Sequence, residues 1–258
     1  MAFAQMAARR PIAGAVATLG VSDRVAFLRK TYGLLGVALV GFAVLTAGMM
    51  RFATGASLRF SSWAFTGQLN WLIVIGLFMA VGYVAQKLAM SQTSRSLQLL
   101  GLGIFVAAES ALLQPLLWVL ILRFGDHEML RSGVLISGYA GSILMQAVVI
   151  TLAIFIGLTL TVFITKKDFS FLGGILTIAS FAVLGVILAS MLFGFSLGAL
   201  FCGAVILIMA GYILYQTSLV MSVFPPTGYV AAALMLFSTI ATLFWYVLQL
   251  LMSLNNRR

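Results

Sequence analysis

Charged side chains are scarce in this chain of 258 residues. Only 8% of the residues are Asp, Glu, Lys or Arg, and only five of them are acidic. A soluble domain of this length needs far more polar surface, so a single soluble core is excluded. The chain has one cysteine, Cys202, which cannot form an internal disulfide and which we expect to pack within an apolar run.

The shortage of acids and of histidine also weighs against catalysis and metal binding. No pair of His, Cys, Asp or Glu has ligand spacing within one helix, so we expect no metal, no cofactor and no catalytic residue. Gly194 to Gly198 matches the G-x-S-x-G pattern of serine hydrolases, but the one histidine, His127, lies in an acidic loop. An intramembrane hydrolase would need His127 beside Ser196. The favoured interpretation is a tight turn, or a close helix contact through Gly194 and Gly198. The loop Asp126 to Glu128 is read as solvated, with weak cation binding as its alternative.

Apolar residues are what the chain has in abundance. They make up 63% of it, and the mean hydropathy is +1.17. A spanning helix needs about 20 apolar residues, and seven runs qualify. We therefore predict an all-α polytopic membrane protein with seven transmembrane helices. The runs are Tyr32 to Met50, Leu69 to Gln86, Leu97 to Leu122, Gly138 to Thr165, Phe171 to Phe193, Leu197 to Met221 and Tyr229 to Leu254.

Basic residues lie almost entirely between these runs and give a net charge of +10. This distribution is typical of loops that face lipid headgroups, so we expect the lipid bilayer, and no nucleic acid, as a partner. Residues 1–20 are interpreted as a mobile tail and residues 21–258 as one transmembrane domain. Ser22 to Leu28 is predicted to form a short helix on the membrane surface.

The distribution of Lys and Arg between the two sides predicts the orientation. With seven crossings, nine lie on the side of the tail and six on the other side, which favours a cytoplasmic N-terminus. If the last run re-entered instead of crossing, the split would be eleven against four. Both topologies stay open.

One acid lies inside a predicted span. Glu109 is mid-run, about one turn before Gln114 and Pro115, where proline frees a helix carbonyl. An ionisable group in a span is a candidate functional residue, and this one could line a cavity. The alternative is a protonated carboxyl that hydrogen-bonds an amide such as Gln146 and joins two helices.

The last run carries a polar stripe on one helix face. Its members recur at intervals of three and four residues. Hydroxyl groups in membrane helices more often join helices than line a path, and we favour that interpretation. The stripe consists of Thr239, Thr242, Tyr246, Gln249 and Ser253.

Three stretches of the sequence form distinctive motifs. Arg29-Lys30-Thr31-Tyr32 opens the first span, and Thr165-Lys166-Lys167-Asp168-Phe169-Ser170-Phe171-Leu172-Gly173-Gly174 follows the fourth. Gly211 to Ser218, which sets Tyr212, Tyr215 and Gln216 in an apolar run, closes the sixth. These stretches resemble the Bax inhibitor-1 family, in particular its bacterial YccA-like branch. Leu112 to Leu116 is similar to a further family element, with Gln114 where a small residue is usual.

The resemblance implies a fold and a set of activities. The fold has seven helices, six of them wrapped around a central C-terminal helix. Family members are associated with calcium leak, with suppression of stress-induced cell death in eukaryotes, and in bacteria with modulation of a membrane-bound ATP-dependent protease. In leak-type members two carboxylates on the sixth and seventh helices form a pH-sensitive latch, and the matching positions here are Gln216 and Thr239.

The loss of both acids limits what this position can do. Neither an amide nor a hydroxyl takes up or releases a proton to change its charge at physiological pH, so a carboxylate switch is excluded here. We expect a neutral, hydrogen-bonded lock between the two helices. Any leak would be constitutive, absent, or moved to Glu109.

Two functional hypotheses follow. The first is a non-enzymatic protein of the bacterial inner (plasma) membrane that modulates a membrane stress response or a membrane-bound ATP-dependent protease. The second is a leak channel for calcium or another cation that lacks the latch. The candidate pore or ion-sensing residues are Glu109, Gln114, Gln146, Tyr212, Tyr215, Thr242 and Tyr246.

Overall fold

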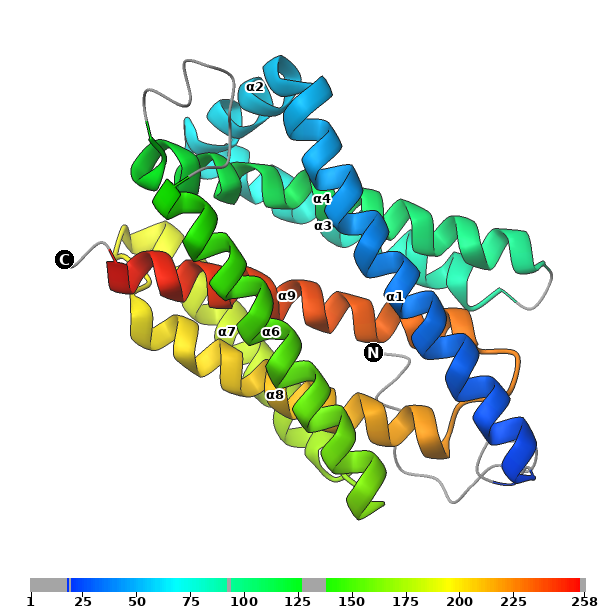
Figure 1. The fold of residues 1–258 in the computed structure, drawn as a ribbon. Helices are drawn as coiled ribbons and strands as arrows, with labels where there is room; N and C mark the ends of the chain where they lie inside the picture. Colours follow the sequence, from blue (N-terminus) through cyan, green and yellow to red (C-terminus); the bar gives the residue numbers. More distant parts are fainter. Residues whose placement is uncertain (1–17, 19, 92–93, 127–137, 256–258) are drawn as a thin grey trace. The chain divides into compact units, whose positions relative to one another are not determined.

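The computed structural model describes residue 18 and residues 20–91, 94–126 and 138–255, and every regular element in these ranges is helical (Figure 1). Seven of the helices are long and apolar enough to cross a membrane, which confirms the seven predicted spans. The exception is the short helix α2. The helices are α1 (Val21–Phe52), α2 (Thr54–Phe65), α3 (Gln68–Ala89), α4 (Arg95–Phe124), α6 (Gly138–Thr165), α7 (Leu172–Phe193), α8 (Ala199–Ser222) and α9 (Tyr229–Asn255).

The first helix is longer than the sequence predicted. The segment Ser22 to Leu28, expected to be a separate helix on the surface, forms the first turns of α1 without a break. No Gly or Pro interrupts the chain between Val21 and Tyr32, and Arg29 and Lys30 are good helix formers, so nothing ends the helix there. Phe27 is buried on the same helix. The prediction of a separate surface helix is therefore wrong.

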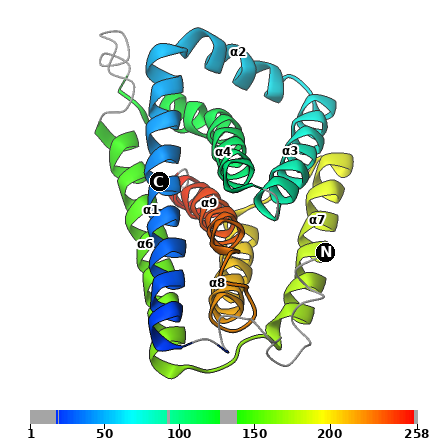
Figure 2. The same cartoon turned by 90° about the vertical axis from the view of Figure 1, so that its right-hand side faces the viewer.

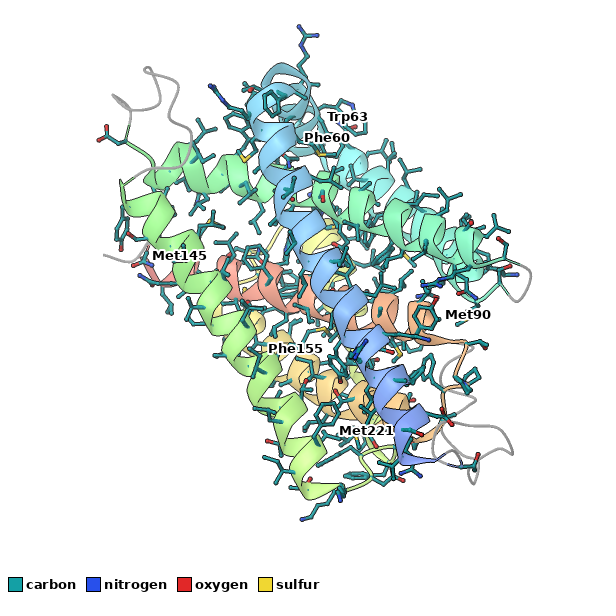
Figure 3. All side chains as sticks on the ribbon, turned by 45° about the vertical axis from the view of Figure 1, so that its right-hand side comes forward. Phe60, Trp63, Met90, Met145, Phe155 and Met221 are labelled. Atoms are coloured by element: carbon teal, nitrogen blue, oxygen red, sulfur yellow. The ribbon has the colours of Figure 1, made fainter. Side chains whose placement is uncertain are left out.

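A second difference lies between the first two spans. The sequence predicted only a polar connection from Arg51 to Asn70, but twelve of its residues form α2. Ser57, Ser61 and Ala64 are buried on one side of this helix. The rings of Phe60 and Trp63, labelled in Figure 3, lie on α2 with their centroids 6.5 Å apart.

The chain divides into two compact units, which are described separately. One comprises the residues up to Leu35 together with Val148 to the C-terminus, and the other comprises Gly36 to Ala147. In the first, α8 packs against both α7 and α9. In the second, α3 packs against α4, and α2 contacts both (Figure 2). The prediction that residues 21–258 form one domain stays a prediction.

The last helix, α9, is the most extensively buried of the spans. In its most apolar stretch 72% of the residues are buried, against 11% in α7. A helix with polar side chains along one face needs such cover, because lipid offers no hydrogen-bond partners. That the six other spans surround α9 stays a prediction.

Candidate functional site

The segment Gly211 to Ser218 lies in the second half of α8. Its buried residues include Ile213, Tyr215, Gln216 and Thr217. Because α8 packs against α7 and against α9, polar groups of this segment meet partners from both neighbours. The candidate site is this junction of α7, α8 and α9 within one unit.

On the α9 side, Gln216 and Thr239 are in direct contact. The Thr239 hydroxyl donates a hydrogen bond of 2.8 Å to Oε1 of Gln216 and also lies 3.3 Å from the Met235 carbonyl of its own helix. Both side chains are buried. The predicted contact between the two positions is present, and it is made entirely by neutral groups that do not titrate at physiological pH.

On the α7 side, two glycines leave space for large side chains of the facing helix. A Cβ atom at Gly173 of α7 would lie 2.9 Å from the ring of Tyr215, and one at Gly211 of α8 would lie 2.9 Å from Cδ2 of Leu176. Each helix thus offers one glycine and inserts one bulky side chain. Close approach of this kind is how membrane helices gain van der Waals contact when lipid provides no hydrophobic driving force.

The Tyr212 hydroxyl joins the same two helices. It donates to the Leu176 carbonyl at 3.2 Å and lies 2.9 Å from the Ser180 hydroxyl. Since its single proton goes to the carbonyl, Ser180 is the donor in the second bond. The Tyr215 ring lies edge-on to that of Tyr212, with centroids 6.4 Å apart. Both tyrosines therefore act in helix packing.

A carboxylate ties the α6–α7 connection to the end of α8. The Ser218 hydroxyl donates to Oδ1 of Asp168 at 3.1 Å and accepts the Phe169 N–H at 3.1 Å. Ser170 adds its N–H and its hydroxyl to the same carboxylate, at 2.8 Å and 3.0 Å. The bond from the Ser170 N–H, helped by the two hydroxyls, holds the pKa of Asp168 below its usual value. We call this group, Asp168, Ser170 and Ser218, the loop clasp.

Three further stripe residues of α9, Thr242, Tyr246 and Gln249, contact the first turns of α8 or their own helix. Thr242 donates to the Ser238 carbonyl at 2.9 Å, and the Tyr246 ring meets Phe201 with centroids 6.0 Å apart. Cys202 lies 3.7 Å from Oε1 of Gln249. These contacts agree with the interpretation of the stripe as a packing surface.

The other predicted residues belong to the second unit. Gln114 is buried, accepts a 2.7 Å bond from Ser57 of α2, and donates to the carbonyls of Thr46 and Ser110 at 3.3 Å and 3.0 Å. Trp118 Nε1 donates to Ser57 at 2.8 Å. Gln114 therefore joins α1, α2 and α4, and its hydrogen-bonding groups are occupied.

The side chains of Glu109 and Gln146 do not form a hydrogen bond with each other. Glu109 is buried on α4, whereas Gln146 is exposed on α6. The Glu109 carboxyl forms no hydrogen bond with any residue that the structure describes. The alternative in which it bonds the amide of Gln146 is therefore wrong.

Sequence reasoning missed the partners of these residues more often than the residues themselves. Ser57 and Trp118 gave no signal, because each acts through a contact with a distant helix. Asp168 and Ser218 both lie in the stretches that carry the family resemblance. The signal for the loop clasp was present in those two motifs, although their contact was not predicted.

The catalytic and metal alternatives gain no support from the described residues. Gly194 ends α7 in the left-handed conformation, with φ of 73° and its N–H bonded to the Ser190 carbonyl at 2.9 Å, and the chain then turns toward α8. The stretch from Gly194 to Gly198 is thus the short connection between two helices. His127 and Glu128 lie outside the described residues, and within those described no three His, Cys, Asp or Glu residues gather as metal ligands would.

Seven spanning helices and a neutral polar junction define a polytopic α-helical membrane protein. The family described as "Inhibitor of apoptosis-promoting Bax1" matches residues 24–257, and the chain belongs to this family.

Among similar proteins, Bax inhibitor 1 of Schizosaccharomyces pombe is 30% identical over 93% of this chain and 81% of its own length. Protein lifeguard 4 of Mus musculus is 31% identical over 94% of this chain and 91% of its own. The Golgi anti-apoptotic protein of Vaccinia virus is 28% identical over 94% of this chain and 91% of its own length. No solved structure matches the chain.

Proposed function

We propose that this protein is a non-enzymatic member of the Bax inhibitor-1 family that modulates a membrane stress response, or a membrane-bound ATP-dependent protease, in a bacterial inner membrane. The observation that carries the proposal is the hydrogen bond between Thr239 and Gln216. In leak-type members this position holds the carboxylate switch that the resemblance implies. A neutral pair here leaves α8 and α9 joined at every physiological pH. Such a junction fits a protein that acts by binding another protein better than it fits a pore that pH opens and closes.

The names of the relatives support the coarser part of this proposal. Bax inhibitor 1 and the Golgi anti-apoptotic protein are named for the control of cell death. In a bacterial cell the corresponding task would be control of damage to the membrane, and proteolysis of membrane proteins is one form of it. The absence of a candidate catalytic group at the junction fits a role through binding.

The test is the turnover of membrane proteins in cells that lack the gene. We expect the half-life of short-lived substrates of the membrane-bound ATP-dependent protease, followed by pulse-chase, to change on deletion and to recover with the wild-type chain. An unchanged half-life would remove the protease from the proposal. A variant such as Ser62→Ala, whose hydroxyl bonds only the Arg59 carbonyl, serves as a complementation control.

A cation leak through Glu109 is the second candidate function. The supporting observation is a buried carboxyl in a span, without a hydrogen-bond partner among the described residues. Such a group is costly unless it binds a proton or a cation. Purified protein in calcium-loaded liposomes would then release calcium, and Glu109→Gln would abolish the release. Absence of flux, or flux that Glu109→Gln leaves unchanged, would end this candidate.

A further inference from the structure

We propose that the first half of α1 and the connection between α6 and α7 together form a binding surface for the headgroups of anionic phospholipids. The surface consists of Arg29, Lys30, Lys166 and Lys167, and we call it the basic end. This inference does not depend on the function proposed above. It concerns only the unit that contains both elements.

Two aromatic contacts place the elements of the basic end together. The ring of Tyr32 on α1 meets that of Phe163 on α6 edge to face, with centroids 5.6 Å apart. Lys30 Nζ lies 5.9 Å from the centroid of the Tyr229 ring at the start of α9. Since Phe163 is three residues before Lys166, the cations of α1 and of the α6–α7 connection lie at the same end of the unit. Met221, labelled in Figure 3, marks this end on α8.

The cations of the basic end outnumber the acids beside them. All four side chains are exposed, and none of them forms an ion pair with any residue in the described ranges. The acid of the connection, Asp168, already accepts hydrogen bonds from Ser170 and Ser218. Only Asp23 adds another negative charge on this part of α1. Four cations against Asp168 and Asp23 leave this end with a net positive charge, which attracts phosphate groups.

Apolar side chains beside the lysines indicate a lipid rather than a free ion. Ile164 is 77% exposed and Phe171 is 68% exposed, on either side of Lys166 and Lys167. Lys166 adopts the left-handed conformation, with φ of 51°, and its N–H caps α6 at the Val162 carbonyl. The helix thus stops where the cations begin. Cations with adjacent exposed apolar groups are typical of segments at the depth of lipid headgroups, whereas a phosphate ion needs no apolar contact.

The experiment measures lipid preference in the purified full-length protein. The probes are phosphatidylglycerol, phosphatidylcholine and inorganic phosphate, added to the protein in neutral detergent. Retention is measured by native mass spectrometry, and stabilisation by thermal unfolding. We expect phosphatidylglycerol to be retained and to raise the unfolding temperature, with little effect of phosphatidylcholine. Because surface cations attract anionic lipid independently, each cation removed should weaken binding about fivefold at low salt.

Two double variants divide the surface between its elements. Lys166→Gln with Lys167→Gln removes the cations of the connection, and Arg29→Gln with Lys30→Gln removes those of α1. Each is expected to lower the affinity for phosphatidylglycerol by about 25-fold. The matched control is Arg59→Gln with Lys87→Gln, which removes the same charge from exposed positions of the other unit. It should retain the wild-type preference.

Several results would overturn the proposal. These are equal effects of the two lipids, an equal loss of affinity in the control, or stabilisation by inorganic phosphate as large as that by phosphatidylglycerol. Unfolding in lipid-free detergent shows whether each variant is folded. If neither double variant folds, the wild-type protein decides: its preference for phosphatidylglycerol should disappear in about 0.5 M salt, where screening acts within a few Å, and a preference that persists would contradict the proposal.

Discussion

The ring of Tyr215 occupies the space in which any side chain at Gly173 would lie, with ring atoms 2.9 to 3.0 Å from the position of a Cβ. Tyr215 is on α8 and Gly173 is in the first turn of α7. The contact therefore joins the two stretches that carry the family resemblance. It makes the bare backbone of Gly173 a requirement of packing.

Substitution of Gly173 tests this contact directly. Gly173→Ala should lower stability by about 1 to 3 kcal/mol, because the methyl group overlaps a buried ring. The matched control is Gly174→Ala, since nothing lies within 4 Å of a Cβ there. Alanine should be neutral or slightly stabilising at that position. Thermal unfolding in detergent, followed by tryptophan fluorescence, measures both, and equal behaviour of the two variants would contradict the close packing.

Restoring an acid at position 216 should restore a response to pH. In Gln216→Glu the side chain is neutral at low pH and can keep its bond to Thr239. At high pH its charge would be buried, at a cost of roughly 2.5 to 3.5 kcal/mol on insertion scales. We therefore expect near wild-type stability at low pH and a loss as pH rises, while the wild-type junction contributes no such change. Unfolding midpoints between pH 4 and about 8 measure this, and a flat profile in the variant would count against a buried, closed pair.

The loop clasp predicts a pH effect of the opposite sign. The pKa of Asp168 is lowered in the folded protein, first by the Ser170 N–H and then by the two hydroxyls. A lowered pKa contributes stability above the unfolded value of about 3.9, and this contribution is lost as pH falls through the folded value. Asp168→Asn should remove this loss of stability at low pH. Because Asp168 is exposed, the effect will be small and will decrease with salt.

Removing the hydroxyl of Ser218 should open the same clasp at neutral pH. Ser218→Ala leaves the Phe169 N–H and one carboxylate oxygen without this partner, at a cost of about 1 kcal/mol. Ser222→Ala is the control, because that hydroxyl bonds only the Ser218 carbonyl of its own helix. Hydrogen exchange at the Phe169 amide is a direct measurement, and it should accelerate only in the first variant. Unchanged protection would show that the hydroxyl is dispensable.

In the other unit, Ser57 is expected to be the most sensitive residue of α2. It donates to Gln114 and accepts from Trp118, so Ser57→Ala leaves two buried groups unsatisfied and should cost about 1 to 3 kcal/mol. Ser62→Ala removes an exposed hydroxyl from the same helix and should be close to neutral. Fluorescence of Trp118 should also change in the first variant alone. Equal stability of the two variants would show that α2 is held by other contacts.

Much of the fold could be predicted because the spans depend on length and hydropathy, which are local properties. The helix α2 could not, because its twelve residues are too short for a span and its buried side needs the packing of α2 against α3 and α4. The start of α1 was misread for a related reason: Arg29 and Lys30 suggested a boundary, but charge does not break a helix.

The candidate site was predictable in its positions and not in its contacts. The contact of Gln216 with Thr239 is predictable because the resemblance implies two facing groups there. Nothing local to Asp168 shows that its carboxylate reaches Ser218, fifty residues along the chain. Likewise, the place of Gln114 beside Pro115 and about one turn after Glu109 suggests a pore residue, but it does not show the hydrogen bonds by which Gln114 joins α1, α2 and α4.

The two reciprocal contacts between α7 and α8 have a mechanical consequence. Tyr215 fits over Gly173 and Leu176 fits over Gly211, so sliding either helix along the other would drive a bulky side chain onto its neighbour's flank. Rotation is opposed in the same way, and the loop clasp adds a tether at one end. A conformational change that moves α7 would therefore carry α8 with it as one rigid lever, with the bending left to the chain before Asp168 and to the connection between α8 and α9.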